Sequence, residues 1–345
     1  MCQPEGFVKQ GEEHKVCLLE KALYGLKQAG REWQSTLFAK LCENGYVQSK
    51  KEPCIFFKLR LSKTTIIGVY VDDLLITGDD ELEIELISNK LGQSFKMKHL
   101  GEANKFLGME IFRKNDEIHL SQSKYIQEIV QRFKQTNSKL VSTPMSAIYE
   151  PDSNEVITDK YPIREIIGSL SYIANGTRPD IAFAVNNLCR YVSKPTASLW
   201  RAAQRIVKYL NATSHDGLTF KGSSVSIDAW ADSNYAMDKT DRKSTTGMII
   251  RIGENPIIWK SRKQKSVSLS TTEAEYMAAS DATREIVWLR DLLAELNQLK
   301  LSEPTPLYQD NQGAIFLENN NCSNQRSKTL NISTFVSILF VNKFR

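Results

Sequence analysis

Two adjacent carboxylates, Asp72 and Asp73, interrupt the apolar run TTIIGVYVDDLLITG at residues 64–78. The β-branched residues on both sides predict two strands joined as a hairpin, with the acids at or beside its tip. Like charges side by side are unfavourable unless solvent or a cation screens them. The pair is therefore either a solvated turn, where aspartate is common, or part of a cation site.

The segments around this hairpin predict an α+β layer over residues 1–120. Apolar residues at helical spacing alternate there with short β-branched or aromatic runs. We expect helices over 31–46 and 79–91, and strands over 54–58, 106–112 and 117–122.

Residues 121–222 have a helical pattern, which is clearest in SKYIQEIVQRF at 123–133 and LWRAAQRIVKYL at 199–210. Residues 223–328 begin with strand patterns and then alternate helix and strand, which suggests a second α/β domain. We expect strands over 225–232, 245–253, 255–261, 266–270 and 306–310, and helices over 272–296 and 311–320.

A second group of acids stands at predicted element ends: Asp232 and Asp310 end strands, and Glu275 lies in the first turn of a helix. Each has a simpler explanation. Asp232 could be an outward polar residue, and Asp310 could cap the next helix. Glu275 could complete a capping box with Thr272, and Glu273 stands in the same relation to Ser270. Strand ends and helix starts can, however, converge at one rim of a sheet.

The cysteines and histidines show no metal-binding spacing, so any metal site must use carboxylates, which favour Mg²⁺ or Mn²⁺. The net charge of +5 permits nucleic-acid binding. Residues 255–270 carry Lys260, Arg262, Lys263 and Lys265 and no acid. No apolar run reaches the length of a membrane span and no signal-peptide core is present, which predicts an intracellular protein.

Ordered motifs throughout the chain resemble the Pol polyprotein of copia-type retrotransposons over its reverse transcriptase and RNase H. QPEGFV at Gln3, LEKALYGLKQAGREW at Leu19 and YVDDLLITG at Tyr70 resemble the reverse transcriptase. LSTTEAEYMA at Leu269 and YQDNQGAI at Tyr308 resemble the RNase H part. Other matching segments lie between them, including GSLSYIANGTRPDIAFAV and DRKSTTG.

The resemblance implies a partial, ferredoxin-like palm over 1–120, a helical thumb or connection region over 121–222, an α/β RNase H-like domain over 223–328 and a divergent tail over 329–345. It implies RNA-directed DNA polymerase and ribonuclease H activities, which are metal-dependent phosphoryl transfers using Mg²⁺ or Mn²⁺. The partners would be an RNA template, a DNA primer, deoxynucleotides and an RNA·DNA hybrid. The location would be cytoplasmic, in the virus-like particle of the parent element, or nuclear.

The same resemblance assigns roles to residues. Asp72 and Asp73 match the metal-binding hairpin of the polymerase, and Tyr24 and Gly25 match positions beside the incoming nucleotide. The RNase H acids correspond to Asp232, Glu275 and Asp310, with Glu275 preferred over Glu273 because A-E-x-x-A is the spacing of that fold. The basic residues Lys260, Arg262, Lys263 and Lys265 would face the hybrid.

Two departures from the family pattern affect the expected activity. The family pattern includes a third polymerase aspartate before the QPEGF motif, and this sequence has none there. It also includes a fourth RNase H acid beyond Lys328, where the tail no longer matches and carries no acid. The sequence therefore predicts no measurable DNA synthesis and weak or absent RNA cleavage. The alternatives are a non-catalytic remnant that binds RNA·DNA hybrids and a pseudogene product.

Overall fold

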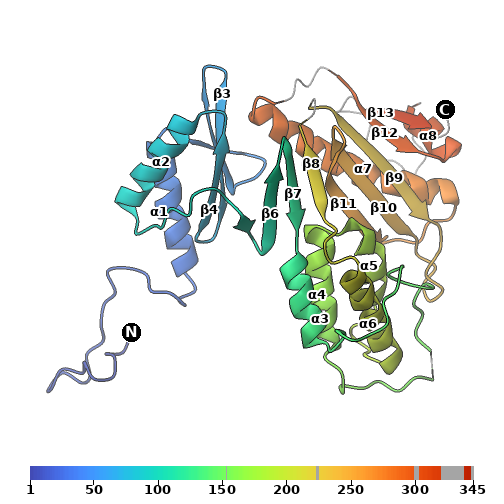
Figure 1. Ribbon diagram of the computed structural model, residues 1–345, viewed down its shortest axis with the longest axis horizontal. Coiled ribbons are helices and arrows are strands. Elements are labelled where there is room, and N and C mark those ends of the chain that lie inside the picture. Colours follow the sequence, from blue (N-terminus) through green and yellow to red (C-terminus); the bar gives the residue numbers. More distant parts are fainter. Residues whose placement is uncertain (153, 223–224, 299–302, 320–337, 343–345) are drawn as a thin grey trace. The chain divides into compact units, whose positions relative to one another are not determined.

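The computed structural model describes residues 1–152, 154–222, 225–298, 303–319 and 338–342 (Figure 1). Its contacts divide the chain into two compact units, Met1–Leu100 and Gly101–Arg345. The predicted boundary at residue 120 thus differs from the observed one. None of the helices in the described part of the chain is long and apolar enough to cross a bilayer.

The first unit is an antiparallel sheet covered by two helices, as its hydrophobic pattern predicts. Helix α1 spans Ala29–Glu43 and α2 spans Glu81–Ser94. The strands pair in chain order, and they are β1 (Val47–Gln48), β2 (Ile55–Arg60), β3 (Lys63–Tyr70) and β4 (Asp73–Gly78). Apolar side chains from both helices and the sheet form one buried core. This confirms an α+β layer, while its ferredoxin-like arrangement stays a prediction.

The second unit starts with a small antiparallel sheet of order β5-β6-β7-β8. Its strands are β5 (Lys105–Phe106), β6 (Met109–Lys114), β7 (Glu117–Ser121) and β8 (Leu218–Lys221). The strands near 106–122 were expected to belong to the first layer. They form a separate sheet instead, in which β7 pairs with β8, about 100 residues further along the chain. Such a long-range pairing leaves no local sequence pattern.

The helical region predicted over 121–222 is confirmed between β7 and β8. It contains α3 (Ser123–Arg132), α4 (Ile163–Gly176), the 3₁₀ helix η1 (Pro179–Ile181), α5 (Ala182–Cys189) and α6 (Ala197–Ala212). Their apolar faces enclose a shared core that includes Ile166, Leu170 and Leu199, each fully buried. Thr196 caps α6 by accepting a hydrogen bond from the Leu199 amide.

The last part of the chain forms a mixed five-stranded sheet of order β11-β10-β9-β12-β13 (Figure 1). Its strands are β9 (Ile227–Asn234), β10 (Thr245–Ile252), β11 (Asn255–Lys263), β12 (Thr305–Gln309) and β13 (Ile338–Asn342). The first three are antiparallel, whereas β12 runs parallel to β9 and to β13. The segment predicted as a divergent tail therefore supplies a strand.

Helix α7 (Thr271–Glu295) packs on one face of this sheet, and α8 (Gln312–Asn319) follows β12. The predicted strand over 266–270 is wrong. Its Ser268 is buried and donates a hydrogen bond to Gln264, and Ser270 caps α7. The segment is thus the entry to a helix, and its alternating serines reflect these contacts and not a sheet.

The helical region and the mixed sheet are packed together within the second unit. The Trp259 indole of β11 donates to the carbonyl oxygen of Ala174 in α4 at 2.8 Å. Arg190, which follows α5, donates to Thr245 of β10 at 2.7 Å and pairs with Asp238. The two regions predicted over 121–222 and 223–328 therefore share an interface.

We predict that Gly217→Ala destabilises the second unit by about 2 kcal/mol or more. A clash with a main-chain atom cannot be removed by rotating a side chain, so the backbone itself would have to move. An added Cβ would overlap the carbonyl oxygen of Leu120 in β7, which adjoins β8. Urea unfolding of both variants measures the effect. Gly222→Ala is the control, since its Cβ would meet nothing within 4 Å. Equal stability of the two variants would contradict the pairing of β7 with β8.

Candidate functional site

The structure brings together three carboxylates that are distant in sequence. Asp232 lies near the end of β9, Glu275 in the early part of α7, and Asp310 directly after β12. Each offers an oxygen, and these atoms lie within 4.8 Å of one another. Because β9 and β12 are parallel neighbours, both strands end at the same edge of the sheet, where α7 begins.

Capping does not explain Glu275 or Asp310. The capping box at the start of α7 is formed by Ser270 and Glu273: the Glu273 amide donates to Ser270 Oγ at 3.1 Å, and the Leu269 amide donates to Glu273 Oε2 at 2.7 Å. At α8, Asn311 Oδ1 accepts from the Ala314 amide at 2.9 Å. Neighbouring residues therefore perform the two capping roles.

Glu275 is the buried member of the group, with 6% of its surface exposed, whereas Asp232 and Asp310 are exposed. The Ser233 amide donates to Glu275 Oε1 at 3.1 Å. The buried Oε2 has no hydrogen-bond partner among the residues that the structure describes. Burial raises the pKa of Glu275 to about 7; the Asp232 and Asp310 charges add to the rise, and the Ser233 hydrogen bond opposes it.

These residues fit a hard divalent cation. Mg²⁺ and Mn²⁺ prefer carboxylate oxygens, and a cation would compensate both the repulsion among the acids and the unsatisfied Oε2. Within the described ranges, no other set of three or more candidate ligands comes this close together. The geometry thus supports the predicted grouping.

A cavity of about 290 Å³ adjoins Asp232 and Asp310. Aromatic side chains line it, including Trp230 and Tyr308, whose rings stack with centroids 5.2 Å apart. Strand alternation places Trp230 and Asp232 on the face of β9 opposite to the alanines that pack with α7. The exposed acids are therefore accessible from the side of the sheet that α7 does not cover.

The acids predicted for the polymerase, Asp72 and Asp73, lie in the first unit. Asp72 and Asp73 are exposed at the β3–β4 turn, where Val71 has φ +52° and its carbonyl oxygen accepts from the Trp33 indole at 2.8 Å. The hairpin is confirmed. No third metal-ligating side chain joins this pair in the described part of the chain.

The predicted nucleotide-binding residues precede α1 in the same unit. Tyr24 is fully exposed, and Gly25 has φ +93°, a conformation that favours glycine. Their role stays a prediction.

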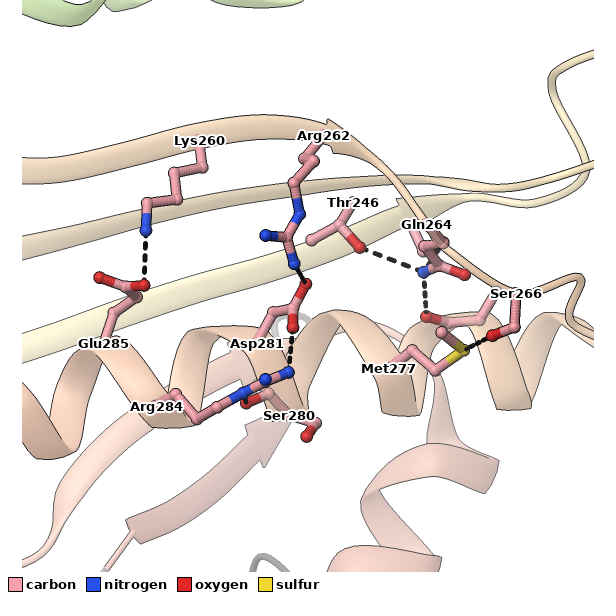
Figure 2. Close-up of polar contacts among 12 residues, drawn as sticks. Thr246, Lys260, Arg262, Gln264, Ser266, Met277, Ser280, Asp281, Arg284 and Glu285 are labelled. Carbon is pink, nitrogen blue, oxygen red and sulfur yellow. Dashed lines mark hydrogen bonds and ion pairs between the residues drawn. The ribbon is translucent and has the colours of Figure 1, made fainter. Parts of the chain in front are cut away.

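The predicted basic surface is divided between the two faces of β11. Lys260 and Arg262 point toward α7 and pair with Glu285 and Asp281 (Figure 2). Lys263 is on the opposite face.

Lys263 pairs there with Asp238 and Asp241. Lys265 is exposed in the loop between β11 and α7. The expectation of one hybrid-facing surface thus needs correction, because side chains alternate along a strand and the acids that pair with this run are remote in sequence.

One contributor to the site has no signature in the sequence. Ser233 contributes through its main-chain amide, which donates to Glu275. Any residue other than proline carries such a donor, so the side-chain pattern contains no signal for it.

We predict that Glu275→Gln stabilises the metal-free protein in a pH-dependent way. The folded pKa of about 7 exceeds the ordinary 4.5, so the wild type loses stability as pH rises from about 4.5 to 7. The variant should gain at most about 3 kcal/mol above pH 7 and little near pH 4. Urea unfolding in EDTA across this range measures the difference.

Glu273→Gln is the control, since Glu273 is only half-buried and belongs to the capping box. The difference in unfolding free energy between Glu273→Gln and the wild type should not change in favour of the variant as pH rises from about 4.5 to 7. A pH-independent difference between Glu275→Gln and the wild type would contradict the raised pKa.

Comparisons with known proteins agree with the sequence motifs. A family model described as reverse transcriptase (RNA-dependent DNA polymerase) matches residues 1–147. The Pol polyprotein from transposon TNT 1-94 of Nicotiana tabacum is 39% identical over 96% of this chain and 26% of that protein. The corresponding polyprotein from transposon RE1 of Arabidopsis thaliana is also 39% identical, over 96% of this chain and 23% of its own length.

The chain thus spans about a quarter of the length of these polyproteins. A transposon Ty5-1 protein of Saccharomyces cerevisiae is 31% identical over 82% of this chain and 94% of that protein. Among solved structures, LC11-RNase H1, isolated from compost, covers 34% of the chain and 84% of its own length at 12% identity, with a TM-score of 0.26. The sequence relatives show that the chain belongs to the retrovirus-related Pol polyprotein family of copia-type transposons.

Proposed function

We propose that Asp232, Glu275 and Asp310 bind Mg²⁺ or Mn²⁺ and direct hydrolysis of the RNA strand of an RNA·DNA hybrid. The observation that carries this proposal is the convergence of the three acids around the buried, unsatisfied Glu275 Oε2. Membership of the Pol family supports the substrate class. The proposal concerns this site and not the activity of the longer polyproteins.

The role proposed for each acid follows from its exposure to solvent. Asp232 and Asp310 are open to solvent and would contact the metal at its accessible side. Glu275 is buried, and its Oε1 accepts a hydrogen bond from the main-chain amide of Ser233. A bound metal would act as a Lewis acid toward the phosphate and lower the pKa of an attacking water. Its charge would also reverse the upward pKa shift of Glu275.

A second proposal concerns the first unit, where Asp72 and Asp73 would bind the metal of a nucleotidyl transfer that extends a DNA primer on an RNA template. The match of residues 1–147 to the reverse transcriptase family and the exposed acids of the β3–β4 turn support it. Tyr24 and Gly25 would then lie beside the deoxynucleotide. Because the described residues add no third carboxylate to this pair, we expect RNA cleavage to be the stronger activity.

Asp232→Asn is expected to lower Mg²⁺-dependent cleavage of a hybrid labelled on its RNA strand by roughly 100-fold or more, because a metal ligand is lost. The matched control is Asp228→Asn. Asp228 lies on the same strand but pairs with Arg251 at 2.7 Å, so this variant should keep activity within a few-fold of wild type.

Cleavage that is unchanged in Asp232→Asn would refute the assignment. Binding of the hybrid without any wild-type cleavage would instead favour the non-catalytic alternative.

Lys265→Ala should reduce the salt dependence of hybrid binding, lowering the slope of log K against log salt by about 1. Arg262→Ala should leave this slope nearly unchanged, since Arg262 is paired with Asp281 on α7. Fluorescence anisotropy over a salt series measures both slopes. A larger effect from Arg262 than from Lys265 would show that the α7 side binds the hybrid.

A further inference from the structure

Gln264 is a buried amide directly after β11, and only 5% of its surface is exposed. Its main-chain amide donates to the Ser244 carbonyl oxygen at 2.8 Å, which holds the residue beside the start of β10. The side chain therefore enters the region where the β-strands and the first turn of α7 meet (Figure 2).

The Gln264 side chain links four separate segments. Its Nε2 donates to the Ala274 carbonyl oxygen at 2.9 Å, and it lies 3.1 Å from Thr246 Oγ1 and 3.3 Å from Ser233 Oγ. Its Oε1 accepts from Ser268 Oγ at 3.1 Å. One amide thus connects α7, β10, β9 and the loop that enters α7.

Two of these partners are next to the proposed metal ligands. Ser233 follows Asp232 and donates its main-chain amide to Glu275 Oε1, and Ala274 immediately precedes Glu275. Gln264 therefore connects the Ser233 hydroxyl of β9, beside Asp232, to the main chain of α7 beside Glu275. A change in this connection alters the separation of the two carboxylates without removing either one.

We infer that Gln264 is a positioning residue, which holds Asp232 and Glu275 at the separation that binds a divalent metal; this inference rests on the proposed function. The amide suits the role because its two N–H donors meet hydroxyl and carbonyl acceptors on different elements. A buried network of this kind fixes a single arrangement when its members are satisfied. Losing a supporting contact typically weakens metal binding about 10- to 100-fold.

The test compares Gln264→Met with Gln122→Met. Methionine keeps the length of the side chain but removes the amide. Gln122 is also buried, with 0% exposed, and its Oε1 accepts from Thr177 Oγ1 at 2.9 Å in the helical region. Both variants therefore lose a buried amide, but only Gln264 contacts the neighbours of the acids.

The first measurement is hydrogen exchange of the Ser233 amide in the metal-free protein. We expect Gln264→Met to accelerate this exchange at least about tenfold relative to amides in the centre of β10, and Gln122→Met to leave it unchanged. Equal protection of Ser233 in wild type and Gln264→Met would overturn the inference, whatever the activity of the protein.

The second measurement is Mn²⁺ binding by calorimetry, with Asp232→Asn defining the signal from this site. Gln264→Met should weaken binding at least about tenfold and raise the Mn²⁺ concentration needed for half-maximal cleavage, with the KM for hybrid unchanged. Unaltered Mn²⁺ affinity in Gln264→Met would overturn the positioning role.

If the wild type binds no Mn²⁺ that depends on Asp232, the proposed function fails, and the Ser233 exchange result still decides the inference about Gln264. If Gln264→Met does not fold, Ser268→Ala serves as a milder variant, because it removes one hydroxyl, which donates to Gln264 Oε1 and also lies 3.5 Å from Met277 Sδ, and leaves the other Gln264 contacts in place. It should shift Ser233 exchange in the same direction, and no shift would count against the inference.

Discussion

The parallel pairing of β12 with β9 is the constraint on which the carboxylate site depends. Tyr308 lies opposite Trp230 in this pairing, and each is followed two residues later by an acid. Because side chains repeat every second residue along a strand, Asp232 and Asp310 lie on the same face as the two stacked rings. A register shift of one residue would turn one acid to the other face of the sheet.

The close approach of α7 to the sheet supplies the third acid. Ala278 and Ala282 of the helix and Ala229 and Ala231 of β9 are all nearly or fully buried in one cluster. Small side chains on both surfaces let the helix lie near the strand, so that Glu275 reaches the main-chain amide of Ser233. The packing of these small apolar side chains therefore determines how close the buried Glu275 carboxylate comes to the exposed Asp232 and Asp310.

This arrangement concentrates negative charge where the acids meet and neutralises positive charge elsewhere. Burial and the two neighbouring acids raise the pKa of Glu275 to about 7. The raised pKa means that the ionised carboxylate is unfavourable at this position, because no positive charge compensates it. On β11, by contrast, Lys260, Arg262 and Lys263 each have an acidic partner. The site thus carries uncompensated negative charge, while most of the basic run is already paired within the protein.

The sequence by itself determined the family and most of the helices and strands, and it indicated the three candidate acids, because periodicity and motif spacing are local properties. It could not determine the partners of Lys260 and Arg262, the pairing of β8 with β7, or the capping roles of Glu273 and Asn311 in place of Glu275 and Asp310. Each of these depends on contacts between segments far apart in the chain. Only the tertiary structure brought the acids within reach of one ion, because that distance follows from strand pairing and helix packing and not from the order of residues.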